Sequence, residues 1–93
     1  MDEDRRNLMG RIEILRAYSK ALQDPEKLIR VCLDVSGDDV EERSAIAAAF
    51  EVADFAADAI LAMQVRLFTP RRSEEIRREL ADANRLLLDL DRS

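Results

Sequence analysis

The run DFAADAILAMQVRLFTP, residues 54–70, would be apolar around nearly the whole circumference of a helix. One face would carry Phe55, Ala56, Ala59, Met63 and Leu67, and the other would carry Ala57, Leu61, Val65 and Phe68. Because a helix that is apolar all round has to be buried, both faces need cover. The rest of a 93-residue chain can cover one face, and a bare second face would be of the kind that marks interfaces. The pattern alone leaves two interpretations open: an ordinary core helix, and a helix that meets a second copy of the chain.

The composition favours a small helical domain that gains from association. The chain has 47% hydrophobic and 38% charged residues with only two glycines and two prolines, which favours a single all-α domain over residues 1–93. A chain of this length buries only about 60% of the surface that its unfolded form exposes, so a partner subunit would add stability. The net charge of −5 argues against attraction to nucleic-acid phosphates.

The residue types present exclude several kinds of site. Without histidine there is no histidine-dependent triad and no ordinary zinc site, and no apolar run approaches the ~20 residues that span a bilayer. The first residues, MDEDRR, are too polar for a signal peptide. Cys32, the only cysteine, lies in the apolar run LIRVCLDV and is expected to be a small core residue. We expect a cytoplasmic protein with no catalytic residue, no cofactor and no metal.

Helix start and stop signals divide the chain into five helices. The first is expected over about residues 4–23, and Asp24 with Pro25 ends it and caps a second helix that runs to about Asp34. The sequence SGDD then breaks the chain, with Asp38 or Asp39 capping a third helix. Asp54 could cap the fourth, although residues 51–53 lack glycine and proline and could stay helical. Pro70 ends the fourth helix, and the last spans about residues 73–91 with Ser73 as its cap.

The first and last helices carry matching apolar seams. Spacings of three and four residues place the following side chains on the two seams: Leu8, Ile12, Leu15 and Leu22 on the first, and Ile76, Leu80, Ala83, Leu87 and Leu90 on the last. If the helices between them fold into a compact head over about residues 24–70, the seams can join as an antiparallel pair. The expected object is a short antiparallel two-helix stalk that carries a small helical head.

Three ordered segments carry a resemblance to a known family: RIEILRAYSKALQDPEKLIRVCLD, FEVADFAADAILAMQVRLFT and EEIRRELADANRLLLDL. Together they resemble the exit-gate (C-gate) coiled-coil and dimerisation region of the bacterial type IIA topoisomerase A subunit, that of DNA gyrase or topoisomerase IV. In that family an Arg-x-x-Ile-Leu pattern opens the first helix, a head follows, and a Gln-Ala-x-Ala-Ile-Leu helix makes the two-fold contact. The two patterns carry onto this chain as Arg11, Ile14 and Leu15, and as Ala57, Ala59, Ile60, Leu61, Met63, Val65, Phe68 and Thr69.

The chain departs from the family at several positions. Residues 53–56 stand where the family has a polar start to the gate helix, Ala62 replaces an acidic residue and Pro70 replaces a glycine. The gate helix of this chain is thus more apolar than its model in the family. Nothing resembles the winged-helix domain that supplies the cleavage tyrosine, and Tyr18 is expected to be a packing residue.

The resemblance therefore implies a non-catalytic homodimer. The fourth helices of the two copies would meet across a two-fold axis, and one self-complementary patch on each copy would be enough for this contact. The residues expected at the dimer interface are Phe55, Ala56, Ala59, Ile60, Met63 and Leu67.

Several functions remain open at this stage. The homodimer could regulate a topoisomerase by docking on the matching gate of its A chain, or it could be a private dimerisation or scaffold module unrelated to topoisomerase activity. A small helical enzyme of the chorismate-mutase type is a further alternative, with Arg5, Arg11 and Arg16 as candidate ligands of a dicarboxylate. The pairs Arg71-Arg72 and Arg77-Arg78 could touch phosphate, but the acidic residues among them favour a mixed-charge exposed face, and we expect no direct nucleic-acid binding and no membrane contact.

Overall fold

A computed structural model describes residues 2–63 and 69–92, and this part of the chain is all helical. The helices are α1 (Asp2–Gln23), α2 (Pro25–Asp34), α3 (Asp39–Phe50), α4 (Asp54–Leu61) and α5 (Pro70–Arg92). The all-α class predicted from the sequence is confirmed for the described residues.

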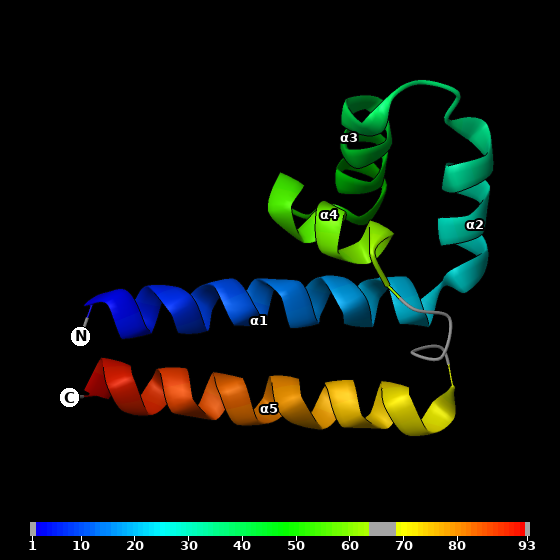
Figure 1. Cartoon of the computed structure of the whole chain (residues 1–93). Coiled ribbons are helices and arrows are strands. Elements are labelled where there is room, and N and C mark those ends of the chain that lie inside the picture. The colour runs from blue at the N-terminus through cyan, green and yellow to red at the C-terminus, as the bar shows by residue number, and fades with distance from the viewer. Residues whose placement is uncertain (1, 64–68, 93) are drawn as a thin grey trace.

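The two long helices α1 and α5 lie side by side and antiparallel, with both termini at the same end of the molecule (Figure 1). Their shared core joins eight of the predicted seam residues and Tyr18: Ile12, Leu15, Ile76 and Ala83 are buried, and Leu8, Tyr18, Leu22, Leu80 and Leu87 pack against them. The last predicted seam residue, Leu90, is exposed. Spacings of three and four keep these side chains on one stripe, so a single line of contact runs along most of both helices.

The short helices α2, α3 and α4 form a group that lies against α1 on the side away from α5 (Figure 1). The second core of the chain consists of Ala17 and Ala21 of α1 with Ile46, Phe50, Ala56, Ala57 and Ile60 of α3 and α4. Because this core involves the side of α1, the group stands beside the helix and not beyond its end. Helix α1 is therefore the middle layer of the molecule.

Helix caps form where the sequence places acidic residues before α2 and α3. The Asp24 carboxylate accepts a hydrogen bond from the backbone N–H of Lys27 at 3.2 Å, and the Asp38 carboxylate accepts one from that of Glu41 at 3.0 Å. Pro25 occupies the start of α2, where its missing N–H costs no helical hydrogen bond. The cap predicted at Asp24 is confirmed, and of the two candidates for the third helix, Asp38 and Asp39, Asp38 is the cap.

The boundary between α3 and α4 was open in the sequence and is a break in the structure. Glu51 adopts the left-handed conformation with φ of 55°, and the Val52 N–H donates to the carbonyl of Ala47. A residue in this conformation after the last helical turn ends the helix even without glycine. Ala53 holds the N-cap position of α4, so the prediction of Asp54 as the cap was wrong by one residue.

Two further boundaries differ from the predictions. Helix α4 ends at Leu61, well before Pro70, so Met63 is not part of it; Val65, Leu67 and Phe68 lie outside the described residues. Helix α5 begins at Pro70 and not near Ser73. The reason is local, because the Thr69 hydroxyl accepts from the Arg72 N–H at 3.4 Å and Pro70 suits the first helical position.

Cys32 is exposed, which corrects its expected place in the core. Helix α2 turns Leu28 and Val31 toward the second core, and these side chains are themselves only partly buried. None of the ten residues of α2 is fully buried. A position one residue beyond Val31 is about 100° further round the helix, which places the thiol at the edge of the packed side.

The contact between α1 and α4 depends on small side chains, and a larger one should destabilise the fold. Replacing Ala17, which has no exposed surface, by leucine is expected to lower the free energy of unfolding by about 1–3 kcal/mol, because no space remains between the two backbones. Urea unfolding followed by circular dichroism would measure it. Ala48→Leu, on the exposed side of α3, is the matched control, and an equal loss in both variants would contradict this packing.

An ion pair joins the two ends of the chain and predicts a pH effect. The Arg5 Nε donates to an Asp91 carboxylate oxygen at 2.8 Å, and this hydrogen bond, with the charge of Arg5, lowers the pKa of Asp91 from its ordinary value. The contribution of the pair is therefore present above the ordinary pKa of an aspartate and is lost as the pH falls through the lowered one.

The change Arg5→Gln should raise the pKa of Asp91 toward its ordinary value, as measured by NMR titration of the side-chain carboxyl group. Arg85→Gln is the control, because Arg85 pairs with Asp82. An unchanged titration of Asp91 in the Arg5 variant would show that the pair does not persist in solution.

Candidate functional site

The residues predicted to meet a second copy fall into different environments. Ala56 and Ile60 are 1% and 2% exposed, because they pack in the core against α1 and α3. Met63 packs against the same core and is partly buried. While this fold is kept, Ala56 and Ile60 have no side-chain surface to offer another chain.

Of the predicted interface residues that lie on α4, only Phe55 and Ala59 remain accessible. Phe55 is 47% exposed and Ala59, one turn further on, is half-buried; we call these two residues the α4 surface. Leu61 is also exposed but lies on a different side of the helix, since six residues correspond to a rotation of about 240°. The structure therefore reduces the expected interface on α4 to one large apolar side chain and its small neighbour.

A larger apolar surface lies on α2, which the sequence analysis did not single out. Ile29 and Leu33 are 59% and 79% exposed, and the exposed Cys32 is next to them; we call these three residues the α2 surface. The signal was present in the sequence, because Ile29 and Leu33 are four residues apart and lie outside the stripe made by Leu28 and Val31. Helix α2 is thus apolar over more of its circumference than its own chain covers.

A small hollow adjoins the α2 surface. It has a volume of about 160 Å³ and is lined by Cys32, Val35, Glu42, Ile46 and Leu61, which come from the α2 end, α3 and α4. Since Cys32 belongs to both features, the hollow continues the exposed apolar surface inward between the short helices.

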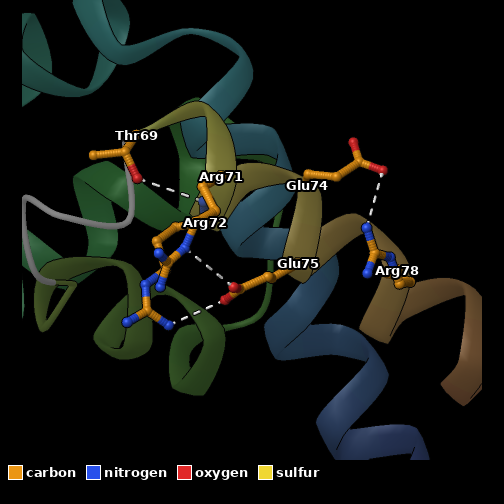
Figure 2. A network of polar contacts seen from close by, with 6 residues as sticks. All are labelled: Thr69, Arg71, Arg72, Glu74, Glu75 and Arg78. Carbon is orange, nitrogen blue, oxygen red and sulfur yellow. Dashed lines mark hydrogen bonds and ion pairs between the residues drawn. The ribbon is translucent and has the colours of Figure 1, made fainter.

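The arginines at the start of α5 are paired with glutamates of the same helix (Figure 2). Glu75 pairs with Arg72 at 3.0 Å and with Arg71 at 3.6 Å. Glu74 pairs with Arg77 at 3.2 Å and with Arg78 at 4.0 Å. Each of these four arginines lies within ion-pair distance of one of the two glutamates, and such exposed pairs at helical spacing contribute a few tenths of a kcal/mol each. The arrangement is that of a mixed-charge helix face.

Two lysines line an open hollow of about 530 Å³ between the end of α1, the start of α2 and the end of α3. Lys20 donates to the carbonyl oxygens of Phe50 and Glu51, both at 3.1 Å. Lys27 Nζ lies 4.9 Å from the centre of the Phe50 ring, a cation–π distance. Both lysines therefore hold the end of α3, and acidic Asp24 and Glu51 share the lining.

The arginines considered for a dicarboxylate site are not gathered around that hollow. Arg5 pairs with Asp91 at the far end of the helix pair, and neither Arg11 nor Arg16 lines the hollow with Lys20 and Lys27. Within residues 2–63 and 69–92, no group of three metal-ligating side chains comes together. No helix in that part of the chain is long and apolar enough to cross a membrane.

No protein-family model matches the chain, and no curated protein is significantly similar to it.

The lysine contacts predict a measurable contribution to stability. Lys20→Met keeps the aliphatic stem of the side chain but removes both hydrogen bonds to the end of α3. It should lower the free energy of unfolding by about 0.5–1 kcal/mol, which is small for two hydrogen bonds because the site is open to water. Thermal and urea unfolding would measure the change. Arg11→Met, an exposed position of the same helix, should have little effect. Equal stability of the two variants would mean that the lysine contacts contribute nothing.

Proposed function

We propose that this chain is a non-catalytic homodimerisation module of the type of a stand-alone topoisomerase exit gate. The observation that carries the proposal is the distribution of large apolar side chains. Among the described residues, nine large hydrophobic side chains are exposed, and five of them lie on the short-helix group: Ile29, Leu33, Val40, Phe55 and Leu61. The other four lie on the long helices, Met9 on α1 and Leu86, Leu88 and Leu90 on α5, while most of the α1–α5 seam is covered within the chain. Exposed apolar residues on neighbouring short helices, with Leu33 the most exposed of all, are typical of an interface.

The make-up of the second core supports the same proposal. Four of its seven buried residues are alanines, which contribute little apolar area each. Burial of a large aliphatic or aromatic side chain stabilises a fold by about 1.5–3 kcal/mol. A chain that is stable as a monomer would therefore be expected to bury its large apolar side chains and expose its small ones. Association through the short helices would bury large side chains that folding alone leaves in water.

The resemblance to the exit gate supports a two-fold contact on this group of helices. In the family the head between the two arm helices holds two subunits together, and here α1 and α5 pair while α2, α3 and α4 stand between them in the chain. An isologous contact needs only one self-complementary patch on each copy. The proposal assigns the chain the holding role of the gate and none of the chemistry of DNA cleavage.

The first test is sedimentation of the full chain over low to high micromolar concentrations. The expected result is a species of twice the 10.6 kDa of one chain. A monomer at all concentrations would overturn the proposal.

Adding the DNA gyrase A chain of the same organism separates the two versions of this function. A homodimer that does not bind the A chain favours a private dimerisation module. A mixed species, together with altered relaxation or supercoiling activity, favours regulation of the topoisomerase. Unchanged activity at a large excess of the protein would rule out the regulatory version.

A further inference from the structure

We infer that a second copy of this chain docks on the α2 surface, with the two α2 helices antiparallel across a two-fold axis that passes at the level of Cys32. This inference rests on the proposed homodimer and names its contact. It differs from the contact expected on the fourth helix, where Ala56 and Ile60 are already buried within the chain.

The first argument is the amount of apolar side chain left uncovered on α2. Leu33 is the most exposed large hydrophobic residue among the described residues, and Ile29 lies one turn before it. The thiol of Cys32 and the adjoining hollow extend this apolar area toward Val35 and Leu61. A partner that packs on Ile29 and Leu33 therefore finds a continuous apolar surface.

The second argument is charge complementarity with a second copy. Arg30 and Asp34 lie two residues before and two residues after Cys32. In the part of the chain that the structure describes, neither has an ion-pair or hydrogen-bond partner. A two-fold axis at Cys32 places Arg30 of each copy opposite Asp34 of the other, so one axis creates two ion pairs. These pairs would flank the apolar contact on one side, and the two thiols would lie on the other.

The same axis also aligns the apolar side chains. With 1.5 Å of rise per residue, Ile29 of one copy lies within about 3 Å, measured along the helix axis, of Leu33 of the other. Each large side chain thus fills the space beside its counterpart, and the contact repeats on the other side of the axis. One register satisfies both the charges and the apolar residues.

The α4 surface lacks this complementarity. Phe55 is flanked by Asp54 and by Asp58, and α4 contains no basic residue. Two copies that met through α4 would bring carboxylates together, although Arg43 partly compensates Asp58 within the chain at 3.5 Å. A second copy is therefore better accommodated on α2 than on α4.

The weak anchoring of α2 gives a reason for the contact to form. The helix has ten residues and none is fully buried. Helices shorter than about 12–15 residues are marginal without tertiary packing. Two such helices cover less than the about 800 Å² per partner of a standard interface, so we expect a dimer that dissociates in the micromolar range.

The only cysteine allows a direct test of the register. A short bismaleimide added to the full chain should join Cys32 to Cys32 and give a two-chain band on a denaturing gel. Cys32→Ser is the control that should give none. Efficient dimer in sedimentation without any cross-linked band would overturn the inference.

A charge exchange tests the ion pairs themselves. Arg30→Asp alone sets a new carboxylate of one copy against Asp34 of the other, and Asp34→Arg alone sets two guanidinium groups together. Each single change should therefore raise the dissociation constant about tenfold. The double variant restores opposite charges in the same places and should recover most of that loss. Equal weakening in all three variants would contradict the proposed pairing.

Apolar variants on the two surfaces separate the inference from the proposed function. Leu33→Glu should abolish the dimer and Phe55→Glu should leave it intact, and both positions are exposed enough that the fold is kept. The reverse pattern would overturn the α2 contact while the homodimer stands. A wild-type chain that is always monomeric, whether or not it captures another protein, would overturn both.

Discussion

The arrangement of this molecule depends on α1 being packed on two sides. One side meets α5 through leucine and isoleucine, and the other meets the short helices through Ala17 and Ala21. The two sides need different residues, because a seam of large side chains keeps two helices apart whereas alanines let backbones approach. The positions of α3 and α4 follow from the alanine side, which joins the short helices to the long pair.

The sequence predicted those parts of the fold that local patterns determine. The seams on α1 and α5 repeat at spacings of three and four over most of their length, and the caps at Asp24 and Asp38 need only one side chain and the next few amides. The end of α4 and the start of α5 were predicted wrongly. The start of α5 depends on two competing caps, and Thr69 caps the helix before Ser73 can. The end of α4 depends on how much of an apolar helix the core can cover.

The candidate surface could be predicted from the sequence only in part. Periodicity shows that a residue is apolar and on which side of its helix it lies, but it does not show which sides the rest of the chain covers. The apolar run of the fourth helix was therefore predicted to be an interface, although Ala56 and Ile60 are buried within the chain. Ile29 and Leu33 were not predicted to be exposed, because the apolar residues of α2 could all belong to one buried side. The structure shows that Leu28 and Val31 are the residues of α2 that pack against the second core.

The pairing of the charges distinguishes the surface of α5 from that of α2. On α5, pairs at a spacing of four residues form within the helix in both orders, Glu74 with Arg78 and Arg71 with Glu75. On α2, Arg30 precedes Asp34 by four residues, and Asp34 lies in the last turn, where the helix dipole opposes a negative charge. The two charges are not paired with each other within the chain, and they are well placed for a symmetric partner, since a two-fold axis reverses the direction of the second helix. The same four-residue spacing thus satisfies the charges of α5 within the chain and leaves those of α2 suited to a second copy.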